Sequence, residues 1–137
     1  MPRVLFLENE EILVEDLPIL LKGEGLDVKS TTSIAEALEW FAKEDFDVVL
    51  LDIMMPLAED MDAEQLNHGL ETGIEVARRM RAIKPDVPIV AFTVLSAPEV
   101  LTEIRKAGVV EIIKKPAELD QIAEVLWQVI RGRSGQR

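Results

Sequence analysis

"VVLLDIMMP", residues 48 to 56, is the stretch that decides the fold. Its apolar run, Val48 to Leu51, is continuous rather than alternating, which is typical of a strand covered on both faces in a parallel sheet. The run stops at Asp52. Open parallel sheets bind ligands outside the carboxyl ends of their strands. The stretch therefore predicts an α/β fold in which the Asp52 carboxylate faces a ligand site.

Short apolar runs and helical patterns alternate on both sides of this stretch. Strands are predicted at residues 4–7, 26–30, 47–51, 89–93 and 109–113, and helices at 10–22, 34–43, 73–83, 98–106 and 117–130. This alternation predicts βαβ units and a doubly wound parallel sheet with helices on both faces. The 137 residues, 48% of them apolar, suffice for one domain with a buried core.

Local signals support these boundaries. Two Ser-x-x-Glu sequences read as capping boxes and predict that Ser33 and Ser96 are helix N-caps. Three glycines that follow helical patterns predict left-handed C-caps: Gly23, Gly25 and Gly108.

The composition excludes several classes of function. There is no cysteine, so disulfide and thiolate chemistry are absent. The net charge of −11 opposes binding of nucleic acid, whose phosphates it would repel. No apolar stretch is long enough to span a membrane, and the first residues do not form a signal peptide. We therefore expect a cytoplasmic protein without a membrane or nucleic-acid partner.

Polar side chains are predicted at the carboxyl ends of four strands. Glu8 and Asn9 follow the first strand, Asp52 ends the third, Thr93 ends the fourth and Lys115 follows the fifth. Each alone is explained as a cap, a turn residue or a solvated charge. Their joint placement at one end of a parallel sheet indicates a site.

These residues resemble those of response-regulator receiver domains, the phosphoacceptor domains of two-component signalling. "LLDIMMP" carries most of the resemblance, "VLFLENE" and "KKP" support it, and the similarity extends from Arg3 to Ile130. It implies a flavodoxin-like, five-stranded sheet in the order 2-1-3-4-5. The receiver domain would occupy residues 1–131, with an insert at 57–71 and a flexible tail at 132–137.

The resemblance also implies the roles of the site residues. Asp52 would accept a phosphoryl group from a histidine kinase or phosphotransfer protein, and the domain would signal to a protein output partner. Lys115 and Thr93 would bind phosphoryl oxygens, Lys115–Pro116 would be a cis peptide, and Mg²⁺ would be held by Glu8, Asn9, Asp52 and the Met54 carbonyl. Such a domain is not an enzyme beyond self-phosphorylation and self-dephosphorylation.

Three departures from the family pattern favour an alternative function. Asn9 replaces a metal-binding acid, which weakens Mg²⁺ binding by removing a charge. Val94 replaces a small residue, and Ile112 replaces the aromatic switch residue. The alternative is a degenerate receiver that acts as a phosphorylation-independent interaction or dimerisation module. An aspartate-nucleophile phosphatase is rejected because Met54 stands where its second acid belongs.

The insert, Leu57–Glu71, carries five carboxylates and no lysine or arginine. Repulsion among them predicts an extended or mobile segment that serves recognition or gating. Met61, Leu66 and Leu70 could anchor part of it, and "DAEQLNHGL" is expected to form about one short helical turn before Gly69. Its carboxylates could also complete the metal site. His68, the only histidine, is interpreted as a loop residue.

The last helix has a wide apolar stripe. Ile122, Leu126, Val129 and Ile130 form a core face at helical spacing, and Val125 and Trp127 widen it. The wider stripe is explained either by core packing or by a homodimer or partner surface on the fourth and fifth helices.

Overall fold

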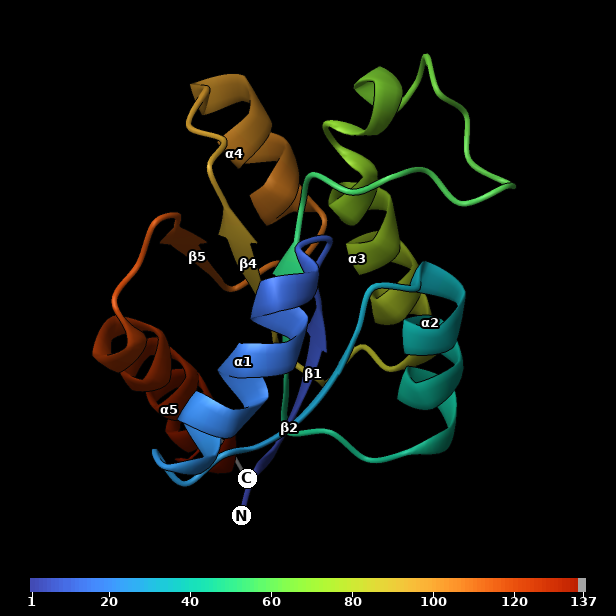
Figure 1. Ribbon diagram of the computed structural model, residues 1–137. Coiled ribbons are helices and arrows are strands. Elements are labelled where there is room, and N and C mark those ends of the chain that lie inside the picture. The colour runs from blue at the N-terminus through green and yellow to red at the C-terminus, as the bar shows by residue number, and fades with distance from the viewer. Residues whose placement is uncertain (136–137) are drawn as a thin grey trace.

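The computed structural model describes residues 1 to 135, in which strands and helices alternate strictly (Figure 1). The strands are β1 (Arg3–Leu7), β2 (Asp27–Thr31), β3 (Val48–Asp52), β4 (Ile89–Thr93) and β5 (Glu111–Lys114). The helices are α1 (Glu11–Lys22), α2 (Ile34–Lys43), α3 (Thr72–Ile83), α4 (Pro98–Lys106) and α5 (Leu119–Gly135), with a short 3-10 helix η1 (Asn67–Gly69) before α3. All neighbouring strands pair in parallel, in the order β2-β1-β3-β4-β5. The predicted fold class is confirmed.

The helices cover the two faces of the sheet and enclose a separate core on each. Side chains of β1 alternate between these cores, because successive strand residues point to opposite faces: Leu5 and Leu7 face α2, α3 and α4, whereas Val4 and Phe6 face α1 and α5. In β3, Val48 and Leu50 face one core and Val49 and Leu51 the other. This double burial explains the unbroken apolar run that predicted a central strand.

Helix α1 continues through Pro18, which cannot donate to the carbonyl of Val14. The hydroxyl of Ser30 in β2 donates to that carbonyl at 2.7 Å instead. The carbonyl that Pro18 leaves without a helical donor therefore links α1 to β2 through Ser30.

The structure confirms some of the predicted helix caps and contradicts others. Ser33 caps α2, its Oγ accepting from the Glu36 amide at 3.1 Å, but Ala97, not Ser96, precedes α4, because Pro98 already takes the first helical position. Gly25 and Gly108 adopt the left-handed conformation, with φ of 86° and 98°. Gly23 keeps a right-handed φ of −63°, since the left-handed residue comes two positions later.

The predicted ends of the last strand and helix also differ from the structure. β5 begins at Glu111, two residues later than the apolar run suggested. α5 continues to Gly135, although the sequence predicted a flexible tail from residue 132; residues 136 and 137 lie outside the described residues. Val125, Trp127 and Val129 are partly buried and pack against the core between α5 and the sheet, as the core-packing alternative predicted.

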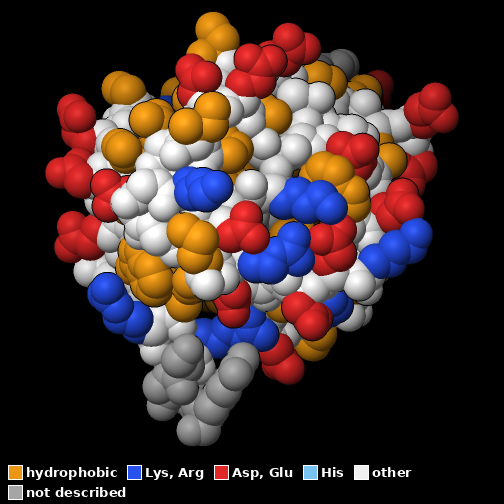
Figure 2. Space-filling view, turned by 60° about the horizontal axis from the view of Figure 1, so that its bottom comes forward, with side chains coloured by type: hydrophobic (Ala, Val, Ile, Leu, Met, Phe, Trp, Pro, Cys, Tyr) orange, Lys and Arg blue, Asp and Glu red, His pale blue; other side chains and the backbone are white. Residues whose placement is uncertain are grey.

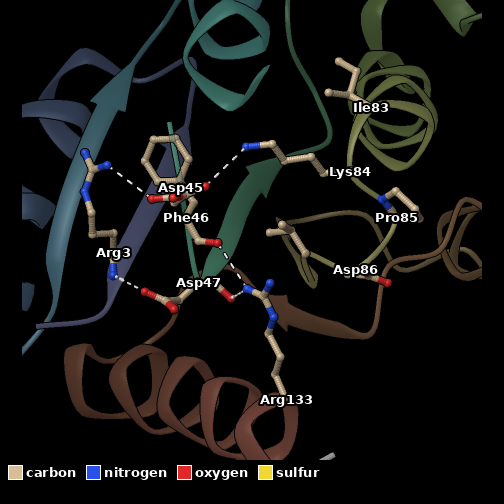
Figure 3. Close-up of a pocket in the computed structure, with 10 residues that line it drawn as sticks. Arg3, Asp45, Phe46, Asp47, Ile83, Lys84, Pro85, Asp86 and Arg133 are labelled. Carbon is tan, nitrogen blue, oxygen red and sulfur yellow. Dashed lines mark hydrogen bonds and ion pairs between the residues drawn. The ribbon is translucent and has the colours of Figure 1, made fainter. Parts of the chain in front are cut away.

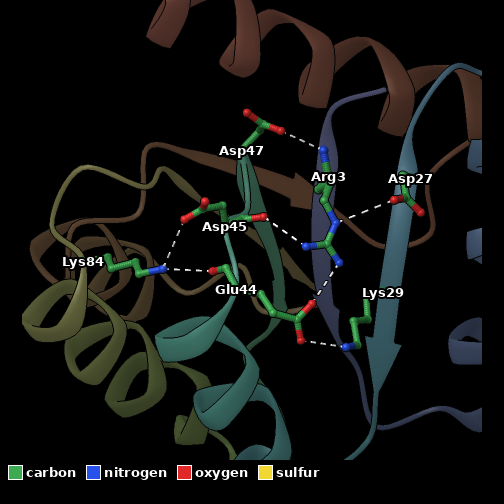
Figure 4. A network of polar contacts seen from close by, with 7 residues as sticks. All are labelled: Arg3, Asp27, Lys29, Glu44, Asp45, Asp47 and Lys84. Atoms are coloured by element: carbon green, nitrogen blue, oxygen red, sulfur yellow. Dashed lines mark hydrogen bonds and ion pairs between the residues drawn. The ribbon is translucent and has the colours of Figure 1, made fainter.

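The amino end of the sheet, where the strands begin, is closed by ion pairs (Figure 4). The guanidinium of Arg3 lies 3.0 Å from Glu44 and 3.6 Å from Asp27, and its backbone amide donates to Asp47 at 2.7 Å. Lys29 binds the other Glu44 oxygen at 2.7 Å. Acidic and basic side chains are accordingly interspersed over this face of the molecule (Figure 2).

Two further cations hold the loop between α2 and β3. Arg133, in the last turns of α5, donates to the carbonyls of Phe46 and Asp47 at 3.2 Å each (Figure 3). Lys84 donates to the carbonyl of Glu44 at 2.9 Å and lies 3.8 Å from Asp45. The ends of α3 and α5 are thus fastened to this loop.

No helix among residues 1–135 combines the length and the apolar composition that crossing a membrane requires.

Candidate functional site

The carboxyl end of the sheet brings together side chains from four adjacent strands. β1, β3, β4 and β5 lie side by side, with Asp52 in register with Phe92, and Thr93 with Lys114. Glu8 and Lys115 each follow the last residue of their strand. The predicted convergence of these residues is therefore observed in the parallel register.

One ammonium group stands between two buried carboxylates. Nζ of Lys115 lies 2.7 Å from Oε1 of Glu8 and 3.8 Å from Oδ2 of Asp52. Glu8 is completely buried and Asp52 is 4% exposed. The ammonium also lies 4.8 Å from the centre of the Phe92 ring, a cation–π contact. Two negative charges thus share one positive charge.

Backbone amides supply the remaining contacts of the two carboxylates. Oδ1 of Asp52 accepts from the Met54 amide at 3.1 Å, and Oδ2 accepts from the Asn9 amide at 3.4 Å. Oε2 of Glu8 accepts from the Glu10 amide at 3.0 Å. These donors fix the orientation of both carboxylates without another charged side chain.

The electrostatic imbalance is visible in the pKa of Asp52. Burial, together with the neighbouring Glu8 carboxyl, raises this pKa from its ordinary value of 3.8 to about 7, although the Lys115 ammonium and the Asn9 amide act in the opposite direction. A second cation near Asp52 would lower the pKa and restore the carboxylate.

The remaining predicted residues border this pair. Thr93 is buried, and its Oγ1 accepts from the Leu95 amide at 3.1 Å, so the hydroxyl proton is free to turn elsewhere. The Lys115–Pro116 peptide is cis, as the resemblance implied. Val94 is 53% exposed, and Ile112 packs against the core beneath α2, α3 and α4.

The oxygen donors fit Mg²⁺, which prefers carboxylate and carbonyl ligands and keeps several waters. Within residues 1–135, no three His, Cys, Asp or Glu side chains gather as a metal cluster. The charged protein ligands available to a metal are therefore the carboxylates of Glu8 and Asp52. The Met54 carbonyl and the side-chain amide oxygen of Asn9 are the neutral ones nearby. The idea that carboxylates of the insert complete this site gains no support, because Asp60 instead pairs with Arg79 at 2.9 Å.

The insert is not extended throughout, and the short helical turn predicted near Gly69 is present as η1. Asp62 caps a turn by accepting from the amides of Glu64 and Gln65, and η1 follows. Leu66 is buried and Met61 packs on the core, whereas Leu70 is 40% exposed.

Gly69 explains how the end of the insert is tied to the loop after β3. Its φ of 98° suits glycine, and its carbonyl accepts from the Met55 amide at 3.1 Å. A Cβ at Gly69 would lie 2.9 Å from the Met55 carbonyl oxygen. The hydroxyl of buried Thr72 donates to the same Met55 oxygen at 2.7 Å. The end of the insert is thus part of the scaffold behind Asp52.

Sequence reasoning missed two kinds of contact at the site. The Met54 and Asn9 amides leave no sequence signal, because every residue except proline carries such a donor. Phe92 could have been found, because it is the aromatic residue directly before Thr93 in the sequence. Its ring makes a cation–π contact with the Lys115 ammonium.

Comparison with known proteins gives a consistent result. The family model described as "Response regulator receiver domain" matches residues 4–126. The transcriptional regulatory protein ZraR of Escherichia coli (strain K12) is 30% identical over 131 residues, which are 90% of this chain but 27% of ZraR. The chain thus spans about a quarter of that relative's length.

Solved structures share the fold. A CheY-like response regulator receiver domain protein from Methanospirillum hungatei JF-1 is 20% identical and superimposes with a TM-score of 0.85, over 100% of this chain and 99% of the other. The receiver domain of the sensor histidine kinase PA1611 from Pseudomonas aeruginosa PAO1, whose structure has magnesium in the active-site cleft, is 19% identical, with a TM-score of 0.77 over 94% and 97% of the two chains.

Proposed function

The chain belongs to the response regulator receiver domain family, and from this premise we propose that it accepts a phosphoryl group on Asp52 from a histidine kinase or a phosphotransfer protein. The observation that carries the proposal is the buried Glu8–Lys115–Asp52 arrangement. It offers an oriented nucleophile, a cation for the incoming phosphate and hard oxygen ligands for a metal.

In the transfer, a carboxylate oxygen of Asp52 attacks phosphorus and forms a P–O bond. The bond between phosphorus and the donor's histidine nitrogen breaks, and that nitrogen keeps the electron pair. Lys115, already 3.8 Å from Asp52, would neutralise a phosphoryl oxygen, and the Thr93 hydroxyl would donate to another. The product is a mixed anhydride that changes the charge at the carboxyl ends of β3, β4 and β5.

Mg²⁺ would be held by Glu8, Asp52, the Met54 carbonyl and Asn9, and would supply positive charge to the transferring phosphoryl group. The receiver domain of PA1611 has magnesium in its active-site cleft, which supports the proposal of a metal at this end of the sheet. Asn9 contributes no formal charge, so we expect binding weaker than with two acids at this strand end. A cation here also favours the ionised Asp52 that attack requires.

The second candidate is a degenerate receiver that signals through protein contacts without phosphorylation. The observation that favours it is the half-buried Ile112, which packs into the core and offers no aromatic ring for a rotamer switch. Its self-association through α4 and α5 stays a prediction.

Intact mass measured after incubation with a small-molecule phosphodonor and Mg²⁺ tests the proposal. We expect the wild type and Asp47→Asn, a matched change at the amino end, to gain the mass of one phosphoryl group, and Asp52→Asn to gain none. Labelling of Asp52→Asn would place the acceptor elsewhere. A wild type that never gains mass would favour the degenerate receiver.

A further inference from the structure

The first part of the insert forms one wall of a groove that the proposed phosphoryl site does not use. Pro56, Leu57 and Ala58 face the first turns of α2 across a hollow of about 730 Å³. Small-molecule pockets span about 300–1,000 Å³, so the hollow is large enough to receive side chains. Figure 1 shows the segment leaving the end of β3 and running outward on the side that carries α2 and α3.

The groove has an apolar interior. Ile34, Ala35 and Leu38 line it from α2, opposite Leu57 and Ala58. Leu38 and Ala58 also pack against the core, which fixes both walls. At the amino end of α2, the Glu36 amide is already used, because it donates to the Ser33 hydroxyl.

The rim of the groove is acidic. Glu59 and Asp60 line it and are exposed, and Asp62 and Glu64 follow on the insert. The one lining cation, Arg79, is already paired with Glu75 at 3.0 Å and with Asp60 at 2.9 Å. Negative charge therefore exceeds positive charge around an apolar floor.

From these features we infer that the groove between the insert and α2 docks a segment of a partner protein in which apolar side chains are flanked by lysine or arginine. The apolar residues would fill the hollow and a cation would face Glu59, since Asp60 is already paired with Arg79. A second copy of this chain is a poor occupant, because each copy carries a net charge of −11. Asp52 does not line the groove, so the inference does not rest on the proposed phosphorylation.

The test is an NMR titration of the full chain, at physiological salt, with a short peptide of alternating leucines and lysines. We expect amide shifts centred on residues 32–38 and 56–60, and none with a peptide of alternating leucines and glutamates. Shifts centred on another surface, or equal binding of the acidic peptide, would overturn the inference.

Matched variants separate local recognition from general attraction to an acidic protein. Glu59→Lys should weaken peptide binding about fivefold, whereas Glu99→Lys, the same charge change on exposed α4, should leave it nearly unchanged. Leu57→Gln should weaken binding, whereas Ile19→Gln on exposed α1 should not. Equal weakening by both members of either pair would contradict a specific groove.

Discussion

The balance of positive and negative groups differs between the two ends of the sheet. At the amino end, Arg3 and Lys29 share Glu44, and Lys84 and Arg133 bind loop carbonyls, so that charged and polar groups are matched (Figures 3 and 4). At the carboxyl end, Glu8 and Asp52 are buried with a single ammonium between them.

We interpret the matched charges at the amino end as stabilising the fold, and the unmatched charges at the carboxyl end as part of a ligand site. Partly exposed pairs at the amino end each contribute modestly, since water screens them. Buried carboxylates with too little positive charge are costly, and the pKa of Asp52, raised by burial and by Glu8, records this cost. Such perturbed groups cluster at functional sites.

Removing the central cation should give the largest effect. We expect Lys115→Met to lower the free energy of unfolding by about 3 kcal/mol at mildly alkaline pH, because it leaves two buried carboxylates unpaired. The loss should shrink in mild acid, where Asp52 takes up a proton. Urea titration at both pH values measures this.

Lys84→Met is the matched change at the amino end. Lys84 is half-buried and its acidic neighbour Asp45 is fully exposed, so we expect a loss of about 1 kcal/mol or less. Equal losses for the two lysines would mean that the ends of the sheet do not differ.

The same chemical change should have opposite signs at the two ends. Asp52→Asn removes a buried charge, and we expect it to stabilise the fold by about 2 kcal/mol at mildly alkaline pH. Asp47→Asn weakens a bond from the Arg3 amide of 2.7 Å and should destabilise by about 1 kcal/mol.

The pH dependence of Asp52→Asn follows from the raised pKa. The folded wild type holds the Asp52 proton up to about pH 7, whereas the ordinary value is 3.8. Wild-type stability therefore falls as pH rises through this window, and the advantage of Asp52→Asn should grow over the same window. Denaturation in the presence of a chelator measures both variants. A constant difference across the window would contradict the raised pKa.

Replacing Arg133 should lower the free energy of unfolding by less than replacing Lys115 does. Arg133→Met leaves the carbonyls of Phe46 and Asp47 without their donor, and we expect a loss of about 1 kcal/mol together with faster amide exchange in the last turns of α5. Arg131→Met, an exposed change one half-turn earlier, is the control. Unchanged exchange in Arg133→Met would show that the loop does not hold α5.

The fold could be predicted because its signals are local and agree. Val48 to Leu51 form a continuous apolar run since both faces of β3 are covered, and Ser33 with Glu36 marks the start of α2. The start of β5 was misplaced because Val109 and Val110 are apolar but precede the register of paired residues, which begins at Glu111 opposite Val90. At α4, the proline at the first helical position overrode a serine signal.

The site was predicted in part. Strand ends located Glu8, Asp52, Thr93 and Lys115, because parallel strands end together. Their unequal charge balance was not predictable, since it depends on burial and on distances such as the 2.7 Å between Lys115 and Glu8. The insert was predicted in part: Leu66 is a buried anchor and a short helical turn precedes α3, whereas Leu70, another expected anchor, is 40% exposed.

The smallest expected effect concerns Asn9, where the carboxyl end lacks one acid. Its side chain is exposed beside the buried Glu8 and Asp52, and only its backbone amide contacts Asp52. Without metal, Asn9→Asp adds a third acid to an acidic site and should lower stability slightly. With Mg²⁺, the added charge should tighten binding several-fold, since even a screened charge pair contributes about 1 kcal/mol.

Isothermal titration of Mg²⁺ into the wild type and Asn9→Asp measures this difference, and Glu10→Gln, an exposed change next to it, controls for general charge. Without Mg²⁺ the free energy of unfolding of Asn9→Asp should be lower than that of the wild type. With Mg²⁺ it should be higher, so the difference between the two proteins should change sign as the metal is added. Equal affinities would mean that Glu8 and Asp52 alone set the metal affinity. The carboxyl end would then need no further acid, and its difference from the amino end would rest on burial rather than on the missing charge.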